Sequence, residues 1–147
     1  MSTAKRLAFG AGVVGSALTV VWLLRNKRLF VVSDVITGGS NSYPDLRAHV
    51  YFGGAHTVLA KAEEAIRQLA RWRIVVVDTE RDEIHAEAES QMGGFLSDIT
   101  VSTSPLGTRH TRAIIRSRSR FCSGDLGENV RNIVTLQSAM DRLLPGG

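Results

Sequence analysis

The distribution of apolar and polar residues divides the chain into three parts. Residues 7–24, "LAFGAGVVGSALTVVWLL", form one apolar run without a charged side chain. Residues 31–45 are rich in Gly, Ser, Asn and Pro, a composition typical of a linker. After them, short apolar segments alternate with turn residues, which predicts a folded domain over residues 46–147. Residues 1–30 are expected to form a membrane anchor.

The anchor prediction rests on the length and the flanks of the apolar run. Its helix would extend about 27 Å, close to the ~30 Å hydrocarbon core of a bilayer. Basic residues flank both ends, and Trp22 lies where an interfacial aromatic residue is expected. A signal or targeting segment and a buried core helix are the alternatives. The retained anchor is preferred because "RNKRLF", with no small-residue cleavage site, follows the run.

A single-pass anchor makes the lipid bilayer of a bacterial or organellar membrane the first expected partner. Two basic residues before the run and three after it do not decide which side carries the domain. Ala8, Gly12 and Ser16 recur every four residues, and small residues at this spacing let membrane helices pack closely. We therefore also expect other membrane-protein subunits as partners.

The folded part is predicted to be an α+β domain. Short turns between successive strands favour an antiparallel sheet. The two amphipathic helices bury their apolar stripes by packing on one face of that sheet. The expected order is β-α-β-β-β-β-α, with both helices on one face. The expected strands are 46–52, 72–78, 83–90, 95–103 and 109–121, and the expected helices are 55–71 and 125–144. The residues expected to face the core are Ile84, Ala86 and Ala88 in the third strand, Val58, Leu59, Ala62, Ala65, Ile66 and Leu69 in the first helix, and Val130, Ile133, Val134, Met140, Leu143 and Leu144 in the second.

Alternation along the last strand assigns its two faces. Small and apolar residues share one side, whereas Arg112, Arg116, Arg118 and Arg120 share the other. An acidic strand over residues 83–89 points the same way, so the outer face is expected to carry mutually compensating surface charge. The four arginines are nevertheless the candidate docking face for a protein partner.

The end of this strand runs into a turn and a helix through "RSRSRFCSGDLGEN". Gly127 permits tight backbone geometry, and Asp125 with Glu128 is expected to form a capping box at the helix start. Cys122 would need a nearby histidine to act as a nucleophile, and the histidines are dispersed without a motif. A structural thiol is the preferred interpretation.

Charge and composition argue against several kinds of function and several kinds of site. The five basic residues of segment 1–30 account for the positive balance, because the remaining residues carry 13 basic against 14 acidic side chains, a net charge of −1. Nucleic-acid binding is therefore not expected. The single cysteine excludes an internal disulfide bond. His85 with Glu83 and Glu87 suits no common metal site, so neither a metal nor a cofactor is predicted, and no small-molecule substrate can be identified.

Several spaced motifs resemble one known family. "SRSRFCSGDLGENVRNI" resembles the signature of the family known as domain of unknown function 1499, and "WRIVVVDTERDEIHAEAESQMGGFLSDITV" resembles its upstream strands. A cysteine-rich opening common in that family is missing here. The resemblance covers about residues 47–144 and implies membrane association in bacteria and plastids but no established activity. The matching signature positions are Ser117, Ser119, Arg120, Asp125, Gly127, Asn129, Arg131 and Ile133.

The leading functional hypothesis is a non-enzymatic, membrane-anchored interaction or assembly subunit. The alternative is a domain that binds a small amphiphile or lipid in a groove between sheet and helices. An uncharacterised enzyme that uses Cys122 comes third.

Overall fold

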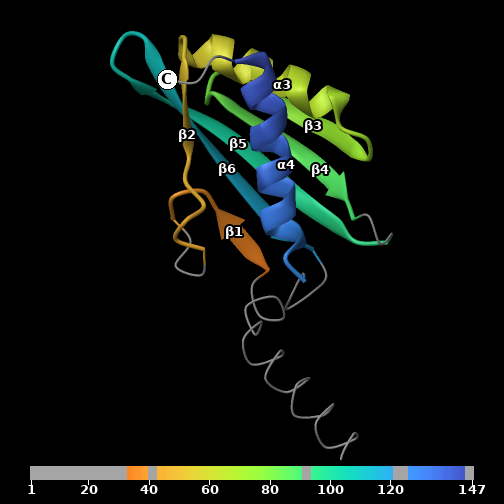
Figure 1. Cartoon of the computed structure of the whole chain (residues 1–147). Coiled ribbons are helices and arrows are strands. Elements are labelled where there is room, and N and C mark those ends of the chain that lie inside the picture. The colour runs from red at the N-terminus through yellow and green to blue at the C-terminus, as the bar shows by residue number, and fades with distance from the viewer. Residues whose placement is uncertain (1–32, 40–42, 91–93, 121–125, 145–147) are drawn as a thin grey trace, which may run out of the picture.

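The computed structural model describes residues 33–39, 43–90, 94–120 and 126–144 (Figure 1). These residues form an α+β domain with one antiparallel sheet and two helices, as the sequence predicts. The strands are β1 (Asp34–Ile36), β2 (His49–Phe52), β3 (Trp72–Asp78), β4 (Glu83–Glu89), β5 (Leu96–Leu106) and β6 (His110–Ser119), and the helices are α3 (Ala55–Gln68) and α4 (Glu128–Leu143).

The sheet has the strand order β1-β6-β5-β4-β3, and β2 also pairs with β6. The two short strands therefore share one edge of β6: β2 pairs with residues 110–113 and β1 with residues 116–118. Between them, the backbone N–H of Ile115 donates to Thr37 Oγ1, and the Thr37 N–H donates to the Ile115 carbonyl, both at 3.0 Å. The threonine side chain thus substitutes for a missing backbone partner.

Both helices pack on the same face of the sheet, in the positions predicted. The predicted inward residues of β4, Ile84, Ala86 and Ala88, are all buried. The predicted stripe of α3 is buried from Val58 to Ile66, and α4 contributes Ile133, Leu136 and Met140 to the same core. Small residues on the sheet leave room for the larger helix side chains, which is why the two layers meet closely.

The structure adds a strand that the sequence pattern did not predict. β1 lies within residues 31–45, so the observed order is β-β-α-β-β-β-β-α. Three residues are too few to show an alternating pattern, and the partner strand β6 is about eighty residues away in the sequence.

The predicted capping box is wrong, because α4 begins at Glu128 and not at residue 125. Gly127 occupies the N-cap position with φ 80° and offers no side-chain hydrogen bond. Glu128 is therefore the first helical residue instead of the third, and its carboxylate accepts a hydrogen bond from Arg131 Nη2 at 2.6 Å. The left-handed backbone of Gly127 is the feature that starts the helix here.

The apolar stripe predicted for the last helix is only partly correct. Val134 was expected in the core, yet 47% of its surface is exposed. Three amide residues occupy buried positions of this helix instead: Asn129, Asn132 and Gln137.

Several predicted features lie outside the described residues. They include the anchor over residues 1–30 with Ala8, Gly12 and Ser16, and also Cys122 and Asp125. Within the part of the chain that the structure describes, no helix is both long and apolar enough to span a bilayer.

Candidate functional site

Asn129 joins three separate segments through hydrogen bonds. Its Oδ1 accepts from Ser117 Oγ at 2.6 Å, and its Nδ2 donates to the Ser33 carbonyl at 3.0 Å and to Ser119 Oγ at 3.1 Å. The Asn129 side chain is fully buried, so an amide without these partners would be costly here. The network connects α4 to β6 and to the residue directly before β1.

Further residues of this segment, among them the signature residues Ser119 and Arg131, support the same joint. Asn132 Nδ2 donates to Ser117 Oγ at 3.3 Å, and the Ser119 N–H donates to the Ser33 carbonyl at 2.9 Å. Arg131 Nη1 donates to the Leu126 carbonyl at 3.1 Å, which fixes the turn before α4. The signature that the sequence placed at a strand-to-helix connection is therefore a polar joint, with Ser119, Asn129 and Arg131 in structural roles.

The three arginines of β6 and Arg120, which directly follows the strand, all point away from the helices, as predicted, but their environments differ. Arg116 donates through Nε and Nη2 to both carboxylate oxygens of Asp34 in β1. The hydrogen bond to Arg116 holds the pKa of the Asp34 carboxyl below its ordinary value, and the same pair raises the pKa of Arg116. This arginine is thus occupied within the chain.

Arg120 is also occupied within the chain. It reaches Asp98 in β5 and, across that strand, Glu87 in β4, each at 2.5 Å. Glu87 accepts a second ion pair from Arg73 in β3. Hydrogen bonds from Arg120, and then from Arg73, keep the pKa of Glu87 below its ordinary value. The acidic and basic strands therefore compensate one another across the sheet, which is the arrangement predicted for this face.

Arg112 and Arg118 are the two exposed arginines of β6 that make no ion pair with a described residue. Arg118 lies opposite Asp98 on one side and Asp34 on the other. Arg112 lies between Val50 and Ser104 and has no carboxylate opposite it. Of the predicted docking face, these two guanidinium groups are therefore the ones without an ion pair to a described residue, although Arg118 also helps to lower the pKa of Asp34.

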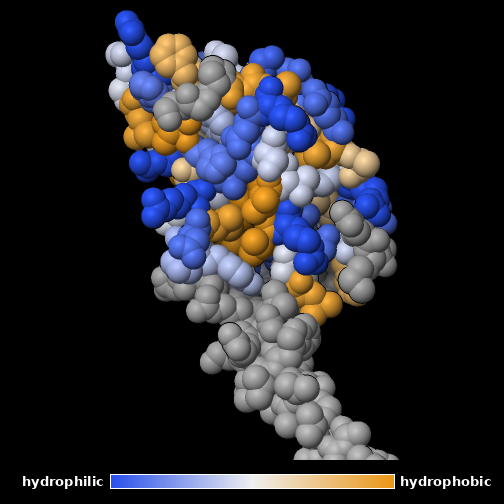
Figure 2. Space-filling view, in the orientation of Figure 1, coloured by the Kyte–Doolittle hydropathy of each residue, from blue (hydrophilic) through white to orange (hydrophobic). Residues whose placement is uncertain are grey.

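A groove lies on the other side of the molecule, between β2 and α4. Its volume is about 770 Å³. Figure 2 shows a hydrophobic area here, edged by hydrophilic residues. Leu46 and Val134 supply apolar surface, and Gln137 closes one wall by donating to the Arg47 carbonyl at 2.8 Å.

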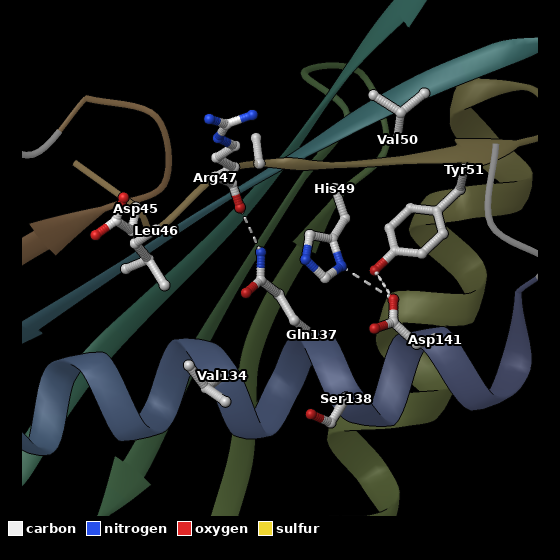
Figure 3. Close-up of a pocket in the computed structure, with 11 residues that line it drawn as sticks. Asp45, Leu46, Arg47, His49, Val50, Tyr51, Val134, Gln137, Ser138 and Asp141 are labelled. Atoms are coloured by element: carbon white, nitrogen blue, oxygen red, sulfur yellow. Dashed lines mark hydrogen bonds and ion pairs between the residues drawn. The ribbon is translucent and has the colours of Figure 1, made fainter. Parts of the chain in front are cut away.

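Asp141 organises the second half of this groove (Figure 3). Its Oδ1 accepts from Tyr51 OH at 2.8 Å and lies 3.1 Å from His49 Nδ1. Burial raises the pKa of Tyr51, and the hydrogen bond to Asp141 adds to that shift. In the neutral tautomer that donates through Nδ1 to Asp141, the Nε2 atom of His49 is a hydrogen-bond acceptor for a ligand. The groove can thus hold a polar group beside an apolar surface.

No sequence pattern indicates the Asp141 cluster, because His49 and Tyr51 lie about ninety residues before Asp141 and share no motif with it. The joint was detectable in principle, since Asn129 and Asn132 fall on the helix stripe that also carries Ile133 and Leu136. Polar residues on an apolar stripe indicate buried partners. In the described part of the chain, no group of three or more His, Cys, Asp or Glu side chains lies close enough together for a metal.

The comparison with protein families agrees with the resemblance of the motifs. The model of a family described as "Protein of unknown function (DUF1499)" matches residues 24–140. No curated protein matches the sequence. Because the match covers most of the chain, this protein belongs to the DUF1499 family, and the identification from the motifs is confirmed.

Proposed function

We propose that this member of the DUF1499 family is a non-enzymatic interaction subunit, held at a membrane by residues 1–30. The observation that carries the proposal is the joint around Asn129. Its hydrogen bonds fix Ser33, the first described residue after the apolar segment, to both β6 and α4. The proposed anchor would therefore join the domain at a backbone position that hydrogen bonds hold on two sides.

The partner is proposed to dock on the outer face of the sheet, at Arg112 and Arg118. Both side chains are exposed and are not neutralised by an ion pair within the described residues. A partner that presents carboxylates there gains new charge-assisted hydrogen bonds without first breaking existing ones. Arg116 and Arg120 contribute less, because their carboxylate partners already occupy them.

The experiment is a pull-down of the tagged full-length chain from native membranes in mild detergent. The double variant Arg112→Ser/Arg118→Ser is compared with Arg142→Ser, which removes an exposed arginine at the end of α4 on the helix side. We expect stoichiometric membrane-protein subunits with the unmodified chain and with Arg142→Ser, and their loss with the double variant. Equal recovery of these subunits with all three chains would contradict the proposal that the partner docks on the sheet face.

A second candidate function is binding of a small amphiphile, and the groove between β2 and α4 favours it. Apolar Val134 and Leu46 lie beside the polar Asp141 cluster, which suits a molecule with an apolar part and a hydrogen-bonding head. Native mass spectrometry of the detergent-solubilised chain should then show a bound small molecule. Val134→Glu, at an exposed position of the groove, should abolish that adduct and leave the pull-down unchanged.

A further inference from the structure

We propose that the end of the domain that carries Leu126 and Phe95 rests on the lipid interface, with these two side chains inserted among the headgroups. This inference depends on the proposed membrane anchor and adds the orientation of the domain to it. Figure 1 shows the first residues of β1 and of α4 at one end of the domain, and the β5–β6 turn at the other.

The length of the chain before the domain restricts this orientation. Ser33 is fixed to the joint, and Arg28, the last basic residue after the apolar run, lies only five positions before it. Five extended residues span at most about 17 Å. β5 alone, with eleven residues, extends about 35 Å away from this end. If the apolar run spans the bilayer, the end of the domain at Ser33 therefore stays close to the membrane surface.

Two large apolar side chains are exposed at this same end. Leu126 directly precedes α4 and is 44% exposed, and Phe95 directly precedes β5 and is 51% exposed. Both lie next to elements of this end: the Leu126 carbonyl accepts from Arg131 of α4, and Leu96, which follows Phe95, accepts at its carbonyl from the N–H of Arg120, directly after β6. In a bilayer interface, apolar and aromatic side chains of this kind are stabilised.

The backbone at Leu126 is a second, independent indication. Leu126 has φ 53°, in the left-handed region where a leucine is uncommon. Glycine or asparagine would adopt this conformation more easily, so the position carries a leucine at a conformational cost. A side chain held out of the core in a strained backbone conformation indicates a role outside the core.

Most charged side chains at this end are compensated within the domain, which bears on the type of lipid. Asp34, Asp98 and Glu128 are each paired with an arginine. Exposed Glu89 lies next to exposed Arg71, whose carbonyl accepts from the Glu89 N–H at 3.0 Å. Insertion of this end therefore does not require anionic lipid, and the proposed occupant is the zwitterionic interface of a phosphatidylcholine bilayer.

The test uses the full-length chain with Cys122→Ser, which removes the only cysteine. A single new cysteine is introduced by Leu126→Cys or, as the control at the other end of β5, by Leu106→Cys, which replaces a leucine of similar exposure. Each is labelled with an environment-sensitive fluorophore and reconstituted into phosphatidylcholine vesicles that contain a nitroxide-labelled lipid. Quenching at position 126 should be several-fold stronger than at position 106, with a blue-shifted emission.

A second pair of positions keeps the test valid if a labelled variant fails to fold. Phe95→Cys and Phe52→Cys replace phenylalanines with the same 51% exposure at opposite ends of the domain, and the same difference is expected. Equal quenching at both ends, or none at positions 126 and 95 in chains that float with the vesicles, would overturn the proposed orientation. Chains that do not float with the vesicles would overturn the anchor itself.

Discussion

Replacing Asn129 with alanine should destabilise the domain more than replacing any other hydrogen-bonding side chain of α4 with alanine. The substitution removes hydrogen bonds to Ser117, Ser119 and the Ser33 carbonyl. A buried hydrogen bond contributes about 0.5–1.5 kcal/mol net, so the three together correspond to about 2–4 kcal/mol of unfolding free energy. For a domain of this size, the melting temperature should fall by about 10 °C or more.

Asn132→Ala is the matched control. It replaces the same residue type one turn later in α4, so the gain in helix propensity is the same in both variants. Among the described residues its side chain donates one hydrogen bond, to Ser117 Oγ at 3.3 Å, and the expected loss is about 1 kcal/mol. Thermal and urea unfolding of both variants measure the difference. Equal losses, or less than about 1 kcal/mol for Asn129→Ala, would refute the joint as the main polar contribution to stability.

Two further variants test the sheet face and the turn. In the folded state the pKa of Glu87 lies below its ordinary value. Its ion pairs therefore stabilise the fold at neutral pH, and this stabilisation is lost as the pH falls through the lowered pKa. Urea unfolding of Glu87→Gln between pH 7 and about pH 2 should therefore show less acid destabilisation than the unmodified chain, and an unchanged pH profile would contradict the ion pairs of Arg73 and Arg120. Gly127→Val should cost more than about 1 kcal/mol because Gly127 has φ 80°, whereas Gly127→Asn should be tolerated better, since asparagine adopts left-handed backbone more readily. Thermal melts that rank the two in the opposite order would contradict the left-handed start of α4.

Regular patterns made most of the fold predictable. The strands β4 to β6 alternate apolar and polar residues over six residues or more, and α3 repeats apolar residues at helical spacing, so their positions and buried faces follow from local sequence. β1 is too short to carry such a signal. The start of α4 was misplaced because Asp125 and Glu128 have capping-box spacing, whereas the backbone conformation of Gly127 decides where the helix begins.

The candidate sites were less predictable because they depend on long-range contacts. The outward direction of the β6 arginines follows from alternation, but the choice of Arg116 and Arg120 for ion pairs depends on Asp34 and Glu87, which lie in other strands. The groove around Asp141 exists only because α4 crosses beside β2. Neither relation leaves a local pattern in the sequence.

Alkaline carbonate extraction tests the central claim, that residues 1–30 hold a separately folded domain at a membrane. The full-length chain is compared with a chain that lacks residues 1–30 and retains Ser33 with all its contacts. We expect the full-length chain to remain in the membrane pellet and the shorter chain to be soluble, with a cooperative thermal melt. A full-length chain released by carbonate, or a shorter chain that is unfolded, would contradict the account.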